Sequence, residues 1–204
     1  MVDWFRRFGD IPSVAYQTPP SVDRRRLRES EAIPEVHVHE FEGKRKEILW
    51  WPAKDGGGSA SPAHCRAFGN SREASTVELL KNCFEGLELP GQPSDYHFLI
   101  QGCASELWKR RRREPEVLDD VEKLCLLDIR LIEAFPDSVR VEFAEEASFF
   151  RVESFSLLIE LYEREGSLRE ALDVAERAVR YGQGIEARDR LAERLASVES
   201  EDRG

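Results

Sequence analysis

The sequence has no long hydrophobic run and few cysteines. No stretch of about 18 consecutive apolar residues occurs, which excludes a conventional membrane-spanning helix. Residues 1–10 lack the apolar core of a secretory signal, so we expect no cleaved leader. The four cysteines (Cys65, Cys83, Cys103 and Cys125) form no CxxC pair, unlike those of zinc knuckles and dense disulfide frameworks. We therefore expect reduced thiols and a cytoplasmic location.

The chain also lacks the excess of basic residues that a general nucleic-acid binder needs to displace counterions. Its 204 residues carry a formal net charge of −10, and this charge is unevenly distributed. Residues 114–204 hold 24 acidic and 12 basic side chains, whereas residues 1–113 are nearly balanced. Such a split indicates parts with different surfaces. We predict an arm over 1–34, a small module over 35–90 and a helical domain over 91–204.

The arm over residues 1–34 shows no helical or strand period. It contains four prolines, and four arginines lie between Arg24 and Arg28, a composition typical of an extended or loosely docked segment. Three aromatic residues lie near its beginning: Trp4, Phe5 and Phe8. We predict that they dock on the body of the same protein. The alternative is a membrane or partner anchor, because aromatic and basic residues together suit a headgroup boundary.

The module over residues 35–90 begins with a strand pattern. Alternating residues over 35–41 and the apolar run over 48–51 predict two strands joined by a polar turn. The segment His64–Phe68 is a candidate third strand. Ser75, followed three residues later by Glu78, is a capping-box signature that begins a helix. We therefore predict a two- or three-stranded sheet covered by one helix.

The histidines of this module are the sequence's one hint of site chemistry. His37 and His39 would point to the same face of a strand, and such a pair supplies two imidazoles to a metal ion. His64 and Cys65 on a neighbouring strand would complete a set of four ligands. The alternative is that all four are ordinary residues of a β-hairpin. A Cys65–His64 nucleophile pair is disfavoured, because adjacent residues on a strand point to opposite faces.

Apolar residues recur at three- and four-residue steps through most of residues 94–198. Breaks at proline and glycine divide this pattern into five helices, over 94–113, 115–135, 143–164, 168–181 and 185–198. Helices joined by short breaks are antiparallel neighbours by default. The first ends in the basic run Lys109–Arg113, which suits the negative end of a helix dipole and is alternatively a nucleic-acid patch.

One helical pair resembles a tetratricopeptide repeat, a helix–turn–helix unit of about 34 residues. The residues that carry the resemblance lie in both helices: Phe155, Leu158, Ile159, Tyr162, Gly166, Leu168, Ala171, Ala175 and Ala178. It departs from the family at Ala175, where an aromatic residue is usual, and at Gly182, where a proline would follow. The segment Leu124–Pro136 resembles, more weakly, the second helix of a preceding repeat. The resemblance implies a short right-handed stack of antiparallel helical hairpins, capped by the N-terminal sheet.

The fold class expected from these observations is mainly α with a small N-terminal α+β module. The resemblance implies an interaction or adaptor protein whose partner is another protein or a peptide. With no catalytic motif in view, we expect no enzymatic activity, no cofactor and no small-molecule substrate. Nucleic acid and membrane are the less favoured partners. Two alternatives stay open: metal binding through His37, His39, His64 and Cys65, and a regulator that contacts nucleic acid through its arginine-rich runs.

Overall fold

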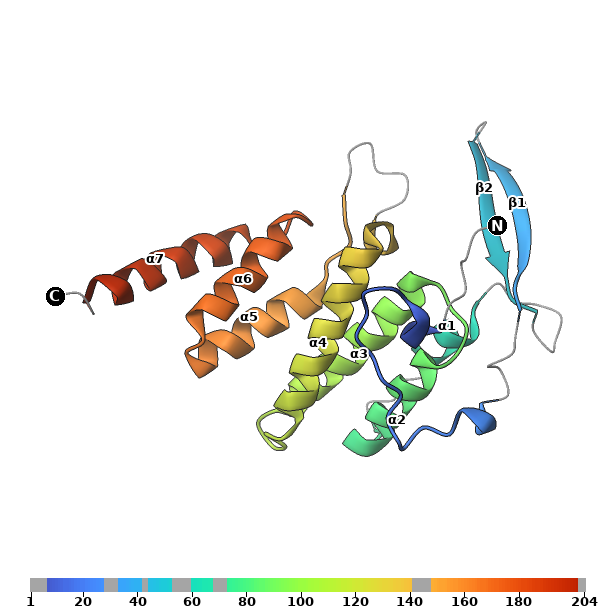
Figure 1. Cartoon of the computed structure of the whole chain (residues 1–204), viewed down its shortest axis with the longest axis horizontal. Coiled ribbons are helices and arrows are strands. Elements are labelled where there is room, and N and C mark those ends of the chain that lie inside the picture. The colour runs from blue at the N-terminus through green and yellow to red at the C-terminus, as the bar shows by residue number, and fades with distance from the viewer. Residues whose placement is uncertain are drawn as a thin grey trace. The chain divides into compact units, whose positions relative to one another are not determined.

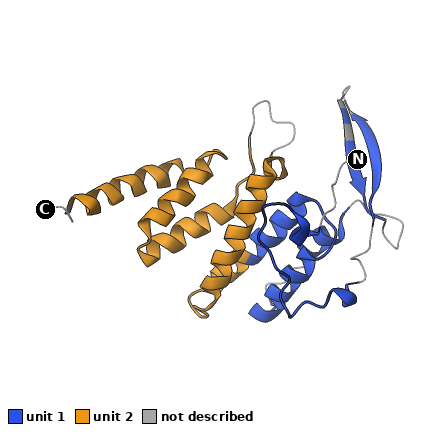
Figure 2. Cartoon of the chain, in the orientation of Figure 1, with its two compact units in different colours: residues 1–103 blue, residues 104–204 orange. Residues whose placement is uncertain are grey.

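The computed structural model of the chain describes residues 7–27, 33–41, 44–52, 60–67, 73–140 and 148–201. Over these ranges the protein is mostly helical and has one two-stranded antiparallel sheet, which confirms the predicted fold class at this level (Figure 1). The chain forms two compact units, residues 1–103 and residues 104–204 (Figure 2). Of the helices in the described part, none combines the length and the apolarity that a bilayer span requires.

The described part of the arm, residues 7–27, packs on the first unit through buried apolar side chains. Phe8 is fully buried, and its ring lies 5.2 Å from the ring of Tyr16 and 5.6 Å from that of Tyr96. Further along the arm, Arg24 forms an ion pair with the buried carboxylate of Glu88. Trp4, Phe5 and Arg28, which the sequence analysis also singled out, lie outside the described residues.

The sheet of the first unit is a hairpin of β1 (Glu35–Phe41) and β2 (Lys44–Trp50). Val36 pairs with Leu49 in its register, and Val38 pairs with Glu47. Among the side chains described in this region, Leu49 and the following Trp51 are buried, while Val36 and Val38 are exposed. Trp50 is half-buried and lies against His37, so the two tryptophans have different environments, as a strand predicts.

The prediction of a third strand at His64–Phe68 is wrong, because residues 62–67 form the helix α1 (Pro62–Ala67). Pro62 suits the first turn of a helix, and the Ser61 hydroxyl caps it by accepting from the His64 backbone N–H. The next helix, α2 (Thr76–Leu87), begins at the predicted capping box of Ser75 and Glu78. It packs against α1.

The five helices predicted over residues 94–198 are all present. They are α3 (Pro93–Arg110), α4 (Val117–Ala134), α5 (Glu153–Glu165), α6 (Leu168–Val179) and α7 (Ile185–Glu201). In the second unit α4, α5, α6 and α7 pack in chain order, each against the next. Gly166 separates α5 from α6 in a left-handed conformation with a φ of 80°, which favours glycine because a Cβ there is strained.

One predicted helix begins later than its pattern indicated. The apolar residues from Phe143 predicted a helix through Arg164, but α5 begins at Glu153. Phe150 instead donates its backbone N–H to the carbonyl of Val139 at 2.7 Å, and Phe149 bridges to Arg140. These backbone bonds to the preceding segment replace helical ones. Residues 141–147 lie outside the described residues.

Polar side chains fix α5 against its neighbours in the second unit. Ser154, in the first turn of α5, donates to the fully buried carboxylate of Asp128 on α4 at 2.5 Å. Tyr162, near the other end of α5, donates to Glu122 at 2.7 Å, and burial together with this bond raises the pKa of its hydroxyl. Since buried polar groups are costly without partners, these bonds specify one position of α5 on α4.

Candidate functional site

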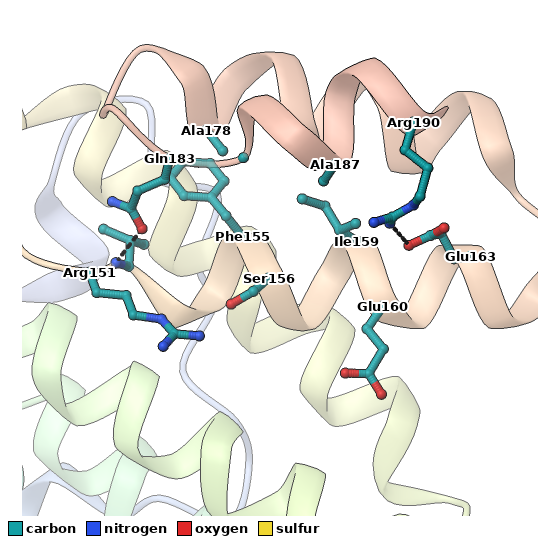
Figure 3. Close-up of a pocket in the computed structure, with 12 residues that line it drawn as sticks. Arg151, Phe155, Ser156, Ile159, Glu160, Glu163, Ala178, Gln183, Ala187 and Arg190 are labelled. Carbon is teal, nitrogen blue, oxygen red and sulfur yellow. Dashed lines mark hydrogen bonds and ion pairs between the residues drawn. The ribbon is translucent and has the colours of Figure 1, made fainter. Parts of the chain in front are cut away.

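A groove of about 450 Å³ opens between α5 and α7 in the second unit, beside the loop that joins α6 to α7 (Figure 3). Its volume falls in the range of roughly 300–1,000 Å³ that is typical of ligand pockets. Residues of both helices, of the loop and of α6 line it: Arg151, Val152, Phe155, Ser156, Ile159, Glu160, Glu163, Ala178, Gln183, Gly184, Ala187 and Arg190. The groove is therefore built on helices that are packed in sequence along the chain.

The floor of the groove is apolar. Phe155 and Ile159 lie one turn apart on α5, and both are almost completely buried. Across from them lie Ala178 and Ala187, whose side chains are single methyl groups (Figure 3). An apolar ligand side chain placed against these walls would itself be removed from water, which favours binding by about 25 cal/mol per Å² of its surface. The floor therefore suits an apolar side chain of a ligand.

Gly184 keeps the loop close to α6 at one end of the groove. Its φ is 77°, and a Cβ at this position would lie 2.9 Å from the Cβ of Ala178 and 3.2 Å from the carbonyl oxygen of Ala175. Both the backbone conformation and the close approach require glycine. The small side chains of α6 thus let the loop pass near that helix before α7 begins.

Gln183 ties the same loop to the segment that leads into α5. Its side-chain oxygen accepts from the backbone N–H of Val152 at 2.9 Å, and its side-chain nitrogen donates to the carbonyl of Phe150 at 3.1 Å. Figure 3 shows the Gln183 side chain at one end of the groove, with a dashed line marking its hydrogen bond to this backbone. The amide of Gln183 takes the place of helical partners for this backbone, so the entry to α5 is held against the entry to α7.

Ion pairs between α5 and α7 close the other end of the groove. The carboxylate of Glu163 accepts from Arg190 at 2.6 Å and from Arg194 at 2.7 Å. Exposed pairs stabilise by only a few tenths of a kcal/mol each, about 0.2–1 kcal/mol. Their main effect is to set the spacing of the two helices.

A second hollow, of about 580 Å³, adjoins the groove at its Gln183 end and shares Arg151 and Gln183 with it. Arg180, from the end of α6, lines it together with Ser148, Phe149, Tyr181 and Gly182. Burial raises the pKa of the Tyr181 hydroxyl, with the Glu133 carboxylate adding to the effect. No carboxylate belongs to the described lining of this hollow, although residues 114–204 hold twice as many acidic as basic side chains.

The residues predicted as metal ligands are not brought together. His37 and His39 lie on β1 with exposed side chains, whereas His64 and Cys65 lie on α1. Within the described ranges, no three or more His, Cys, Asp or Glu side chains form a group that could hold a metal ion. The change of residues 62–67 from a predicted strand to a helix is the reason, since a neighbouring strand was needed to carry the second pair of ligands.

His64 instead belongs to a network that caps two helices. Ser61 donates to Asp95 Oδ2 at 2.7 Å, and His64 Nδ1 lies 3.2 Å from Asp95 Oδ1. Asp95 also accepts from the backbone N–H of Gln92 at 2.8 Å, at the beginning of α3. A hydrolytic triad needs its serine bonded to the histidine, whereas here both contact the aspartate. The geometry is that of helix capping.

The two arginine-rich runs are partly engaged in local contacts. Arg24 forms an ion pair with Glu88, and Arg26 forms one with Asp23, in which Nε lies 3.3 Å from Oδ2. In the second run, the guanidinium of Arg111 lies 4.1 Å from the centre of the Trp108 ring and donates to the Trp108 carbonyl at 2.8 Å. Stacking of this kind is a common structural use of arginine next to tryptophan.

Sequence reasoning did not identify the groove. Phe155 and Ile159 were assigned to the helical hairpin, and Arg151 and Gln183 were not singled out. Gln183 between two glycines after a helix is the one local signal of an unusual loop. The chain matches no protein-family model, no curated protein sequence and no solved structure.

Proposed function

We propose that this chain is a protein-interaction module that binds a peptide segment of a partner in the groove between α5 and α7. The observation that carries the proposal is the groove itself, whose apolar floor lies between ion-paired and hydrogen-bonded ends. The helices α5 and α7, which form the walls, each pack against α6. A site that is already formed spends less free energy on ordering its own side chains and loops when a ligand binds. An extended peptide with one bulky apolar side chain is the ligand that this shape favours.

The proposal includes a tetratricopeptide-like arrangement of α5 and α6. Supporting it, Ala171, Ala175 and Ala178 are fully buried on α6, where close helix contact needs small side chains. If these residues face α5, Ala171→Leu overpacks the interface and lowers the free energy of unfolding by about 1–3 kcal/mol. Thermal unfolding of the full chain tests this, with the exposed Glu176→Leu as the control on the same helix. An unchanged melting temperature for Ala171→Leu contradicts the arrangement.

Peptide selection against the full-length protein tests the binding function. A random peptide library displayed on phage is selected on the wild-type chain, and enriched peptides are then measured on two variants. Ser156→Trp places a large side chain in the groove, and Ser156 is exposed, so folding is not at risk. Ser197→Trp makes the same change at an exposed position of α7 outside the groove.

The proposal predicts that enriched peptides bind the wild type and Ser197→Trp equally and bind Ser156→Trp at least about tenfold more weakly. Far-ultraviolet circular dichroism establishes that both variants keep their helices. Peptides that bind all three proteins alike would place the binding surface elsewhere, and failure to enrich any peptide would contradict the proposed function.

A further inference from the structure

We propose that the hollow beside the groove makes this site selective for acidic peptides, with Arg151 and Arg180 as the groups that bind the peptide's carboxylates. The inference rests on the proposed function, because it names the class of peptide that the groove takes. The peptide would carry a bulky apolar residue on the floor formed by Phe155 and Ile159. One or two Asp or Glu residues nearby in its sequence would meet the arginines.

Charge is the first argument. Arg151 and Arg180 are both exposed, both line the hollow, and neither forms an ion pair with a described side chain. Several other arginines of this unit each contact a carboxylate: Arg169, Arg177, Arg188, Arg190 and Arg194. Two exposed guanidinium groups thus line a hollow whose described lining holds no carboxylate, and they offer positive charge to an anionic ligand.

Continuity with the groove is the second argument. Arg151 and Gln183 belong to the lining of both the groove and the hollow, so one ligand can extend from one into the other. A free phosphate or another small anion would use the arginines but leave the apolar floor empty. A peptide that joins an apolar and an acidic residue uses both, and its extended backbone spans about 3.3 Å per residue.

Chemistry supports arginine in this role. The planar guanidinium matches the geometry of a carboxylate and forms paired, charge-assisted hydrogen bonds with it. The side-chain amide of Gln183 is already bonded to the backbone of residues 150 and 152, so it sets the shape of the site and leaves carboxylate binding to the arginines. Since both arginines are exposed, the selectivity should weaken as salt concentration rises.

Two pools of synthetic octapeptides test the inference. In the acidic pool, Leu is fixed at one position and Glu at two positions after it, with the other positions degenerate. In the neutral pool, Gln replaces both Glu residues. The peptides are acetylated and amidated so that no terminal charge contributes, and binding to the full-length protein is measured by fluorescence anisotropy at low salt. Inorganic phosphate is added as a competitor in a separate titration.

The expected result is that the wild type prefers the acidic pool by about tenfold, and that Arg151→Gln and Arg180→Gln each reduce this preference by about threefold to fivefold. Arg130→Gln, which removes an exposed charge of α4 outside the hollow, should leave the preference unchanged. Millimolar phosphate should compete only weakly.

Each other outcome overturns the inference. Equal binding of both pools, blocked by Ser156→Trp, would contradict acidic selectivity while leaving the groove a peptide site. Strong competition by phosphate, with no effect of Ser156→Trp, would show a small-anion site. Binding of neither pool would remove the acidic class of ligand, and the phage selection then decides separately whether the groove binds other peptides.

Discussion

Replacing Gly184 with alanine should destabilise the second unit more than the same change at Gly182, although both glycines have a positive φ. The φ angles are 77° at Gly184 and 69° at Gly182. Because a left-handed backbone is unfavourable for alanine, each alanine variant should lose about 1–2 kcal/mol of unfolding free energy from this effect alone. At Gly182 the new methyl group meets no atom within 4 Å. At Gly184 it would lie 2.9 Å from the Cβ of Ala178 and 3.2 Å from the carbonyl oxygen of Ala175.

The extra cost at Gly184 follows from these contacts. Real Cβ atoms do not approach another carbon to 2.9 Å, so the loop or α6 must shift, and overpacking of this kind costs about 1–3 kcal/mol. We therefore expect the free energy of unfolding to fall by about 1–2 kcal/mol for Gly182→Ala and by about 2–5 kcal/mol for Gly184→Ala. The difference between the two variants isolates the close packing of the loop on α6.

Urea denaturation followed by far-ultraviolet circular dichroism measures both variants and the wild type. Because the chain has two compact units, the transition is first tested for two-state behaviour with a second probe, and the second unit is fitted separately where the transitions differ. Gly166→Ala is a further control, since its φ is 80° and its Cβ also meets nothing within 4 Å. Equal losses for all three variants would refute the close approach of Gly184 to α6.

Three further changes probe the first unit. Trp51→Ala should lower the free energy of unfolding by about 3–5 kcal/mol because Trp51 is buried, and the half-buried Trp50→Ala should cost clearly less; thermal unfolding of both variants checks this. Arg24→Gln should lower the melting temperature because it leaves the buried carboxylate of Glu88 without its cation, whereas Arg25→Gln, at an exposed position, should not; equal melting temperatures for the two variants would refute the ion pair. Hydrogen bonds from the N-cap Ser75 lower the pKa of Glu78 in the folded protein. The charged Glu78 side chain therefore stabilises the fold fully at pH values above the pKa of an unfolded-state carboxyl, and this stabilisation is lost as the pH falls through the lowered pKa of the folded state. Wild-type and Glu78→Gln melting temperatures should therefore converge in acid, and a constant difference would contradict the capping box.

Local sequence signals predicted much of this fold. The capping box located α2, because its hydrogen bonds join residues only three positions apart. Gly166 located the turn between α5 and α6, because a left-handed residue there needs glycine. Both predictions depend on interactions within one helix end, which the sequence shows directly.

The errors occur where a segment is too short to show a period or where distant residues decide the local structure. Residues 62–67 are too few for the spacing of apolar residues to distinguish a strand from a helix. The segment is helical, and the Ser61 hydroxyl caps the first turn of α1. The beginning of α5 is set by the amide of Gln183, thirty-one positions along the chain from Val152. The same contact shapes the groove, so the candidate site was not predictable from any local pattern.

Hydrogen exchange of the full-length protein with a selected peptide bound tests the central claim most directly. If the peptide lies in the groove, backbone amides at the beginning of α5 and α7 and in the loop around Gln183 should exchange more slowly in the complex. Amides of the β1–β2 hairpin should be unchanged, because the site belongs to the second unit. Protection confined to the hairpin or to the arm over residues 7–27, with α5 and α7 unaffected, would contradict the account.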